Sequence, residues 1–180
     1  IILNKNHQAV LEACVSSILK KSTYRSFEII LVENGSDQEK LFDYYDQLKK
    51  NASFPGQILE WQEPFNYSSI NNWAVGHCNG EILLFLNNDT EVITPNWLEE
   101  MIGLTQQPDA GAVGAKLLFP DRKLQHTGIA QGNFSTQFLF HLAEGLPQEK
   151  SGYRSFTQKL APRLAVTGAC MMIEKRKFQM

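Results

Sequence analysis

The first half of the chain alternates short apolar runs with segments of helical periodicity. Apolar residues recur at helical spacing from about Gln8 to Lys21, directly after the apolar start Ile1–Leu3. The run Phe27–Val32 is short, apolar and rich in β-branched residues. A second periodic block follows, with its apolar positions at Leu41, Phe42, Tyr45 and Leu48. The pattern therefore predicts strand, helix, strand and helix in succession.

The alternation continues into the middle of the chain. The sequence predicts a short strand at Ile58–Trp61 and a longer strand at Glu81–Leu86. Between them, Ser68 or Ser69 is suited to cap a helix that extends to His77. Alternation of this kind is typical of a mainly parallel, doubly wound α/β sheet.

The pattern changes after one more helix. Thr94 as the cap and Pro95 at the first helical position predict that helix. Beyond Gly111, the strand candidates Ala112–Phe119 and Ala169–Ile173 flank a stretch with little periodicity, which predicts a mixed sheet and long loops. No internal repeat or low-complexity linker occurs, so residues 1–180 are expected to form a single domain.

Charge and composition narrow the class of partner. The chain has 180 residues, 43% of them hydrophobic, a formal net charge of −2 and a sequence pI near 6.1. Because nucleic-acid binding needs a strongly basic face, we expect no nucleic-acid partner. No apolar run approaches the roughly 20 residues that span a bilayer. Three widely spaced cysteines in apolar contexts indicate reduced core residues and a cytosolic setting: Cys14, Cys78 and Cys170.

Polar residues follow three of the predicted strands. They lie in Asn4–Asn6, Glu33–Ser36 and Asn87–Thr90. In open parallel sheets, ligands bind outside the carboxyl ends of the strands, where loop amides and helix N-termini converge. The candidate ligand-binding residues at these positions are Asn4, Asn6, Glu33, Asn34, Asn88 and Asp89.

Two of these residues carry a carboxylate. A hard divalent cation that keeps several waters needs only one or two protein carboxylates in addition to phosphate oxygens, and Asp89 is placed to be such a ligand. A turn-forming role for Asp89, with its side chain bonded to its own backbone, fits the same position. A solvated acidic turn likewise fits Glu33.

Three motifs occur in the order N-K-N, FEIILVENGS and SINNWAVGHCNGEILLFLNNDTEV. In this order they resemble the inverting glycosyltransferases of the GT-A fold, over nearly the whole chain. The later segments GAVGAKLLFPDRKLQHTGIAQG and AVTGACMMIEKRKF resemble a bacterial subgroup that builds surface polysaccharides, including rhamnosyltransferase-like enzymes. The resemblance implies a three-layer, Rossmann-like α/β sandwich. It also implies metal-assisted sugar transfer, with inversion, from a UDP- or dTDP-linked donor.

The resemblance assigns roles to individual residues. Glu33 stands where the family usually has an aspartate that contacts the uracil or thymine ring, and Asn72 matches a polar position that lines the nucleotide pocket. Asp89 matches the last acidic residue of the D-x-D metal motif. The first position of that motif is Asn87 here, which offers only a neutral carbonyl oxygen.

A later segment is implied to lie near the donor sugar. It contains Gly168 and Ala169, small residues that let a ligand approach the backbone closely. The family places its general base, a carboxylate, in an acidic motif beyond this segment. We therefore expect the base to lie beyond Met180 and the chain to be a piece of a longer protein, incomplete at both ends, so no catalytic residue is assigned.

The resemblance also implies a cofactor and partners. The cofactor would be manganese or magnesium, the donor a nucleotide sugar, and the acceptor a glycan or a lipid-linked glycan. The expected location is the cytoplasm, with the inner face of the membrane as the alternative through segments outside this sequence.

Some features of the sequence fit other functions. A non-catalytic nucleotide-sugar-binding domain stays open, because no base is visible and Asn87 replaces a carboxylate. A sugar-phosphate nucleotidyltransferase is disfavoured because Asn4–His7 contains no glycine, and a dinucleotide-dependent oxidoreductase because no G-x-G-x-x-G follows the first strand. His126 and His141 lack the close spacing of a dedicated metal site, so structural or loop roles are expected.

Overall fold

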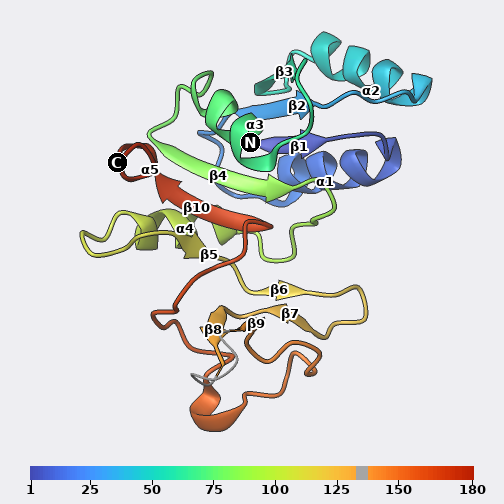
Figure 1. Ribbon diagram of the computed structural model, residues 1–180. Helices are drawn as coiled ribbons and strands as arrows, with labels where there is room; N and C mark the ends of the chain where they lie inside the picture. Colours follow the sequence, from blue (N-terminus) through green and yellow to red (C-terminus); the bar gives the residue numbers. More distant parts are fainter. Residues whose placement is uncertain (133–137) are drawn as a thin grey trace.

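The computed structural model describes residues 1–132 and 138–180. Its centre is a six-stranded sheet in the order β3-β2-β1-β4-β10-β5 (Figure 1). Four neighbouring strands run parallel: β3 (Gly56–Glu60), β2 (Ile29–Glu33), β1 (Ile2–Asn4) and β4 (Ile82–Asn87). β10 (Cys170–Glu174) pairs antiparallel with β4, and β5 (Val113–Gly114) pairs antiparallel with β10. The predicted mainly parallel, mixed sheet is confirmed.

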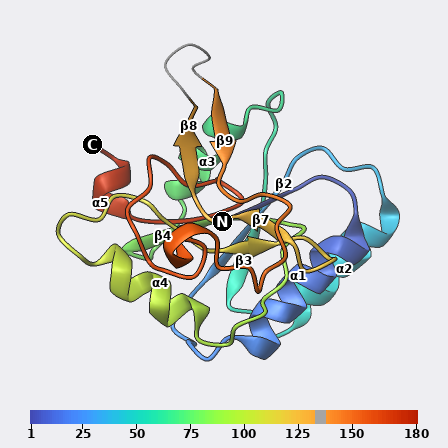
Figure 2. The ribbon, with the colours of Figure 1, turned by 90° about the horizontal axis from the view of Figure 1, so that it is seen from below.

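Helices cover both faces of this sheet. One face carries α1 (Gln8–Lys21), α2 (Glu39–Lys50) and α4 (Trp97–Thr105), and the other carries α3 (Tyr67–Val75) and the short α5 (Lys175–Phe178). Figure 2 shows α1, α2 and α4 together on one side and α3 on the other. The molecule therefore has the three layers expected from the sequence.

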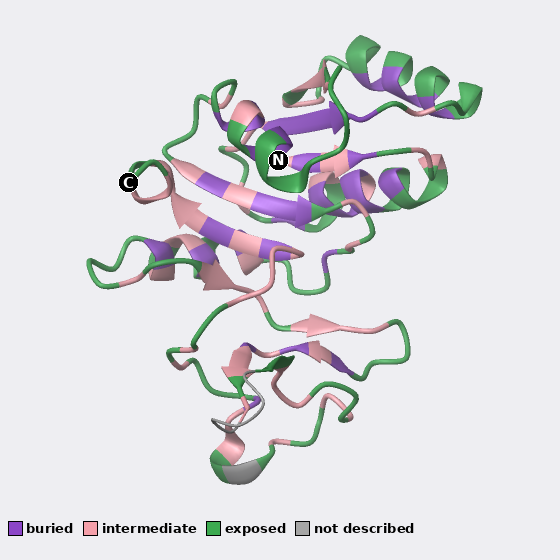
Figure 3. Ribbon diagram, in the orientation of Figure 1, coloured by how far each residue is buried: buried purple, intermediate pink, exposed green. Residues whose placement is uncertain are grey.

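The central strand β2 shows why the layers form. All five of its residues are buried, as the purple strand in Figure 3 shows. Ile29 and Leu31 pack into the cluster beneath α1 and α2, whereas Ile30 and Val32 pack against Ile70 of α3. Successive side chains of a strand point to opposite faces, so a continuous apolar run is stable only where both faces are covered.

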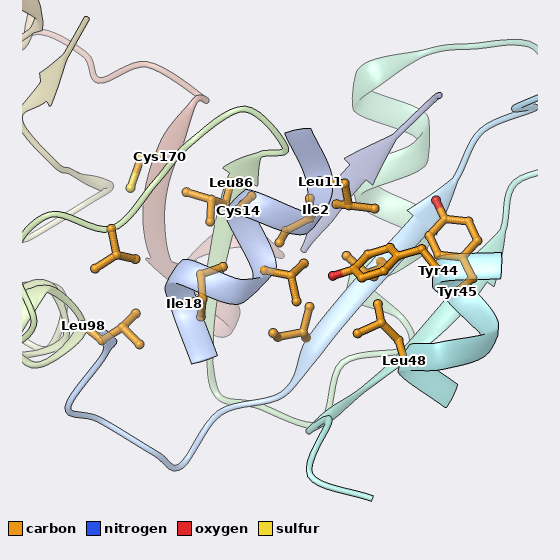
Figure 4. Close-up of a cluster of buried hydrophobic side chains, with 14 of the residues drawn as sticks. Ile2, Leu11, Cys14, Ile18, Tyr44, Tyr45, Leu48, Leu86, Leu98 and Cys170 are labelled. Atoms are coloured by element: carbon orange, nitrogen blue, oxygen red, sulfur yellow. The ribbon is translucent and has the colours of Figure 1, made fainter. Parts of the chain in front are cut away.

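The largest hydrophobic cluster among the described residues joins helices and sheet on the α1 face. Leu11, Cys14 and Ile18 of α1 meet Tyr44 and Tyr45 of α2 and the inward residues of the strands (Figure 4). Residues three and four apart lie on one side of a helix, which explains why this spacing in the sequence marks the buried face of α1.

Two predicted helix starts are wrong. The Asn66 side chain accepts a hydrogen bond from the backbone N–H of Ser69 at 3.0 Å, so Asn66 caps α3 and the helix begins at Tyr67. α4 begins at Trp97, after a turn in which the Thr94 carbonyl accepts from the Trp97 N–H. Thr94 and Pro95 therefore precede the helix, whose N-cap is Asn96; the Trp97 indole N–H donates to the Ser22 hydroxyl at 2.9 Å.

The chain between β5 and β10 forms a separate layer below the sheet. β6 (Leu117–Leu118) pairs with β7 (Leu124–His126), and β8 (Ile129–Gln131) pairs with β9 (Leu139–His141). A 3₁₀ turn, η1 (Tyr153–Ser155), follows in the loop that returns to β10. The single strand expected at Ala112–Phe119 is thus two short strands in different sheets, because β5 pairs with β10 and β6 with β7.

Within the described residues, no helix has the length and apolar character needed to cross a bilayer.

We predict that Gly56→Ala destabilises the fold by about 2–4 kcal/mol, because its backbone has no room for a side chain. A Cβ at Gly56 would lie 2.1 Å from the carbonyl oxygen of Ile29, its partner in the β2–β3 register. Urea unfolding followed by circular dichroism measures the loss. Gly103→Ala is the matched control: nothing lies within 4 Å of a Cβ there, so this change within α4 should stabilise by about 0.5–1 kcal/mol. Equal effects of the two substitutions would contradict the prediction.

Candidate functional site

The carboxyl ends of β1, β2 and β4 meet at one pocket of about 320 Å³. Its lining comes from these strands, from the loops that follow them and from α3 with the chain just before it: Ile1, Leu3, Asn4, Lys5, His7, Asn34, Phe65, Tyr67, Asn71, Leu86, Asn87 and Asn88. A larger cavity of about 470 Å³ lies at the opposite strand ends, lined largely by apolar residues such as Ile29, Leu83 and Trp97. The polar strand ends belong to the smaller pocket, which is therefore the candidate site.

Asn4 is the centre of a buried hydrogen-bond network. Its side-chain oxygen accepts from the Asn88 amide at 2.6 Å, and its amide donates to the Tyr45 hydroxyl at 3.1 Å and to the Asn6 carbonyl at 3.0 Å. Asn4 is only 2% exposed. The residue thus joins the ends of β1 and β4 to α2, and its side chain fixes the pocket floor.

Glu33 is held from within the protein. It is buried, and its carboxylate accepts from the backbone N–H of Ser36, from the Ser36 hydroxyl at 2.8 Å and from the Tyr45 hydroxyl at 2.8 Å. Burial and the bond to Glu33 raise the pKa of Tyr45, which therefore stays a neutral donor. Glu33 braces the turn that follows β2, and the next residue, Asn34, is the one that lines the pocket.

Asn6 ties two of the strand-end loops together. Its side-chain oxygen accepts from the Asp37 N–H at 3.0 Å, and its own N–H donates to the Ser36 hydroxyl at 2.7 Å. Asn6 and His7 both have a positive φ, 58° and 54°. Two consecutive residues in this conformation are unusual outside glycine, and the loop contacts hold them there.

The structure places two neighbouring asparagines of α3 differently. Asn71 is buried, lines the pocket and donates to the Tyr67 carbonyl at 2.9 Å. Asn72, the position expected from the resemblance, is exposed and does not line the pocket. A helix turns by about 100° per residue, so a shift of one position carries a side chain away from a pocket.

Asp89 lies in an exposed turn beside the pocket. The Thr90 hydroxyl donates to the Asn87 carbonyl at 2.9 Å, which closes the turn, and the buried Cys14 thiol lies 3.8 Å from the same carbonyl. Among the described residues, no group of three His, Cys, Asp or Glu side chains is placed to hold a metal ion. The donor set of Asp89 and the Asn87 amide oxygen fits a hard divalent cation that takes its other ligands from water and phosphate.

The segment Thr167–Ala169 lies next to this turn. The Asn87 N–H donates to the Ala169 carbonyl at 3.0 Å, so β10 enters the sheet directly beside the Asn87–Thr90 turn. From α3, the Tyr67 hydroxyl donates to the Gly168 carbonyl at 3.4 Å. A Cβ at Gly168 would lie 2.9 Å from that hydroxyl, so a larger residue there would displace the end of the tyrosine side chain.

The contact between two histidines of the lower layer was not foreseen from the sequence. His126 and His141 are brought together, with their Nδ1 atoms 3.2 Å apart and their rings edge to face. The expectation of structural roles rested on their separation of 15 residues. The pairing of β8 with β9 folds the chain back, so the two histidines lie close in space although they are far apart in the sequence. The residues around each histidine give no indication of this contact.

Known proteins of similar sequence indicate the family to which this chain belongs. Residues 1–178 match the model of glycosyl transferase family 2. The chain belongs to glycosyltransferase family 2. Similar proteins include the O-antigen biosynthesis protein RfbC of Myxococcus xanthus, 38% identical over 181 residues, and the uncharacterized protein y4gI of Sinorhizobium fredii, 39% identical over 178 residues. Each alignment covers 99% of this chain but only 14% and 19% of the respective relative.

Solved glycosyltransferases show the fold of this family 2 domain. GalNAc-T7, solved with UDP, GalNAc and Mn²⁺, aligns over 99% of this chain and 35% of its own, with a TM-score of 0.72 and 16% identity. The mannosyltransferase PcManGT of Pyrobaculum calidifontis, solved with GDP-Man and Mn²⁺, aligns over 67% of this chain and 35% of its own, with a TM-score of 0.58 and 18% identity. The expected GT-A fold is confirmed.

We predict that Tyr45→Phe lowers the free energy of unfolding of this glycosyltransferase domain by about 1–2 kcal/mol, because the Glu33 carboxylate loses a buried donor. Tyr44→Phe is the matched control. Tyr44 is the adjacent buried tyrosine of α2, and within the described residues its hydroxyl makes no hydrogen bond. Chemical unfolding of both variants measures the difference, and equal losses would remove Tyr45 from the network.

Proposed function

We propose that this family 2 domain binds a UDP- or dTDP-linked sugar in the pocket at the ends of β1, β2 and β4 and transfers the sugar with inversion. The convergence of Asn4, Asn34, Asn71 and Asn88 on one pocket beside Asp89 is the observation that carries the proposal. Asparagine side chains offer both donors and acceptors, which suits a uracil or thymine ring and a ribose.

The proposed roles follow the contacts of each side chain. Asn34 and Asn71 face the nucleoside, since both line the pocket. Asn4, Asn6 and Glu33 hold the loops that shape it, because their polar atoms are engaged with protein partners. Asn88 lines the pocket and also donates to Asn4, so it both faces the nucleoside and holds the strand-end loops. Asn72 stays a candidate only for a contact at the pocket rim.

Asp89 is proposed as the metal ligand, with Mn²⁺ or Mg²⁺ as the cofactor. The metals named with GalNAc-T7 and PcManGT support this assignment, as does the chemistry of the Asn87–Thr90 turn. A divalent metal bound here would offset the negative charge that develops on the departing nucleoside diphosphate. Gly168 and Ala169, which adjoin this turn, would border the donor sugar.

The acceptor is proposed to be a glycan or a lipid-linked glycan of a bacterial surface polysaccharide. RfbC, by its name an O-antigen biosynthesis protein, supports this class. The general base that takes the acceptor proton is assigned by the resemblance to a carboxylate outside residues 1–180, so residues 1–180 are proposed to be part of one GT-A domain. A non-catalytic nucleotide-sugar-binding domain is the outcome if binding occurs without transfer in the full-length protein.

Calorimetric titration with UDP and dTDP, each with Mn²⁺ and with EDTA, tests the binding proposal. We expect one of the two nucleotides to bind, and to bind at least about tenfold more tightly with Mn²⁺, because the metal bridges its phosphates to Asp89. ADP serves as the control for base recognition. Absence of binding by both pyrimidine nucleotides would refute the function, whereas equal affinity in EDTA would refute the metal alone.

Asp89→Asn should abolish most of that metal-dependent gain while leaving the melting temperature nearly unchanged. The substitution keeps the shape of an exposed side chain and removes only its charge. Asp109→Asn, at an exposed residue after α4, is the control and should bind like the parent protein. A steep fall in the melting temperature of ligand-free Asp89→Asn would identify Asp89 as a structural turn residue instead.

A further inference from the structure

A histidine of the lower layer reaches the segment that borders the donor sugar. His126 lies at the end of β7 and is 1% exposed. Its Nε2 accepts a hydrogen bond from the backbone N–H of Thr167 at 3.3 Å. The Thr167 hydroxyl in turn accepts from the Ala169 N–H at 3.3 Å. His126 therefore contacts the segment Thr167–Ala169 from the side opposite to the main sheet.

The geometry fixes where the proton of His126 lies. Because Nε2 accepts from a backbone N–H, it carries no proton, and a neutral ring must carry its proton on Nδ1. That N–H faces His141 Nδ1, 3.2 Å away, and the same His141 Nδ1 lies 3.1 Å from the Gln125 carbonyl oxygen. Burial, and to a lesser extent the neighbouring His141, lowers the pKa of His126 to about 4. The ring is thus neutral near pH 7, and the bond to Thr167 is intact there.

Hydrogen bonds around the two histidines connect both small sheets to the chain that leads into Thr167–Ala169. His126 belongs to β7 and His141 to β9. The strand after His126 is joined to the chain before Thr167 by a bond from the Ile129 N–H to the Ala165 carbonyl at 2.9 Å, and Arg163 donates to the Thr127 carbonyl at 2.9 Å. The lower layer and the segment Thr167–Ala169 are therefore one hydrogen-bonded unit.

We propose that His126 is a positioning residue for the donor sugar: by accepting from the Thr167 N–H, it sets the segment Thr167–Ala169 against the Asn87–Thr90 turn. This inference rests on the proposed function, because it assumes that the segment borders the sugar. Within the described residues, two other hydrogen bonds reach the segment, from Tyr67 and from Asn87, and both come from the side of the proposed nucleotide pocket. His126 supplies the anchor from the layer below, so its loss should affect sugar binding more than nucleotide binding.

A pair of amide substitutions isolates the bond to Thr167. His126→Gln places a side-chain amide about as far from the backbone as Nε2 and can still accept from the Thr167 N–H. His126→Asn places its amide near the position of Nδ1, which serves the His141 side but does not reach Thr167. Both variants are polar, and neither titrates, so they differ mainly in this one acceptor.

The measurement is the affinity for a nucleotide sugar relative to its nucleotide, with Mn²⁺ present. The probes are UDP-glucose with UDP and dTDP-rhamnose with dTDP, using whichever pair binds the parent protein. We expect His126→Asn to weaken nucleotide-sugar binding by about five- to tenfold while nucleotide affinity changes less than about twofold. His126→Gln should recover most of the loss. An equal loss for both ligands, an unchanged ratio, or no recovery by Gln would overturn the proposal.

A second measurement needs no substitution. In the unaltered protein labelled with ¹⁵N at histidine, adding the nucleotide sugar should shift the His126 Nε2 resonance, and adding the nucleotide alone should leave it in place. The same response to both ligands, or to neither, would overturn the role of His126 even if His126→Asn fails to fold. If the parent protein binds neither nucleotide nor nucleotide sugar, the proposed function fails as well, and that outcome is distinct from a failure of His126 alone.

Discussion

The parallel register of β1 with its two neighbours is the constraint on which the site depends. Asn4 lies opposite Glu33 on β2, and Leu3 lies opposite Asn87 on β4. Because parallel strands end at the same edge, this register brings three polar segments to one place although they are about 30 and 85 residues apart in the chain. A slip of one residue would turn Asn4 to the other face and separate it from Asn88 and Tyr45.

Much of the fold could be predicted because burial on two faces leaves a strong pattern in the sequence. The run Phe27–Val32 and the helix Gln8–Lys21 were recognisable for this reason, and α1 has the predicted bounds. The start of α3 was not, because Asn66, Ser68 and Ser69 are all suitable caps by type. Only the path of the chain into the helix decides among them, and that path depends on tertiary contacts.

The candidate site was predictable by position but not by role. The strand-end rule pointed to Asn4, Asn6, Glu33, Asn34, Asn88 and Asp89. Of these six residues, Asn4, Asn34 and Asn88 line the pocket. The rule does not tell which polar atoms the protein itself uses. Glu33 faces Ser36 and Tyr45, and the tyrosine comes from a helix whose sequence gives no sign of the contact. Such buried networks form between elements distant in sequence, so the residue types alone do not separate a ligand contact from a brace.

Side chains that bond within the protein and side chains that face the pocket differ in how readily they can bind a ligand. A buried carboxylate that accepts three bonds from its own protein has little capacity left for a ligand, and exchanging one of those bonds for a ligand bond would leave a buried donor unpaired. Asn71 donates one amide N–H to the Tyr67 carbonyl, and within the described residues its side-chain oxygen makes no bond to the protein, so that oxygen is left for a ligand at the pocket wall. The braces and the pocket-facing amides therefore have different roles: the side chains of Asn4, Asn6 and Glu33 hydrogen-bond within the protein and hold the strand-end loops together. A site ordered in this way loses less conformational entropy on binding, which makes the tertiary network behind the pocket as important for recognition as the residues that face it.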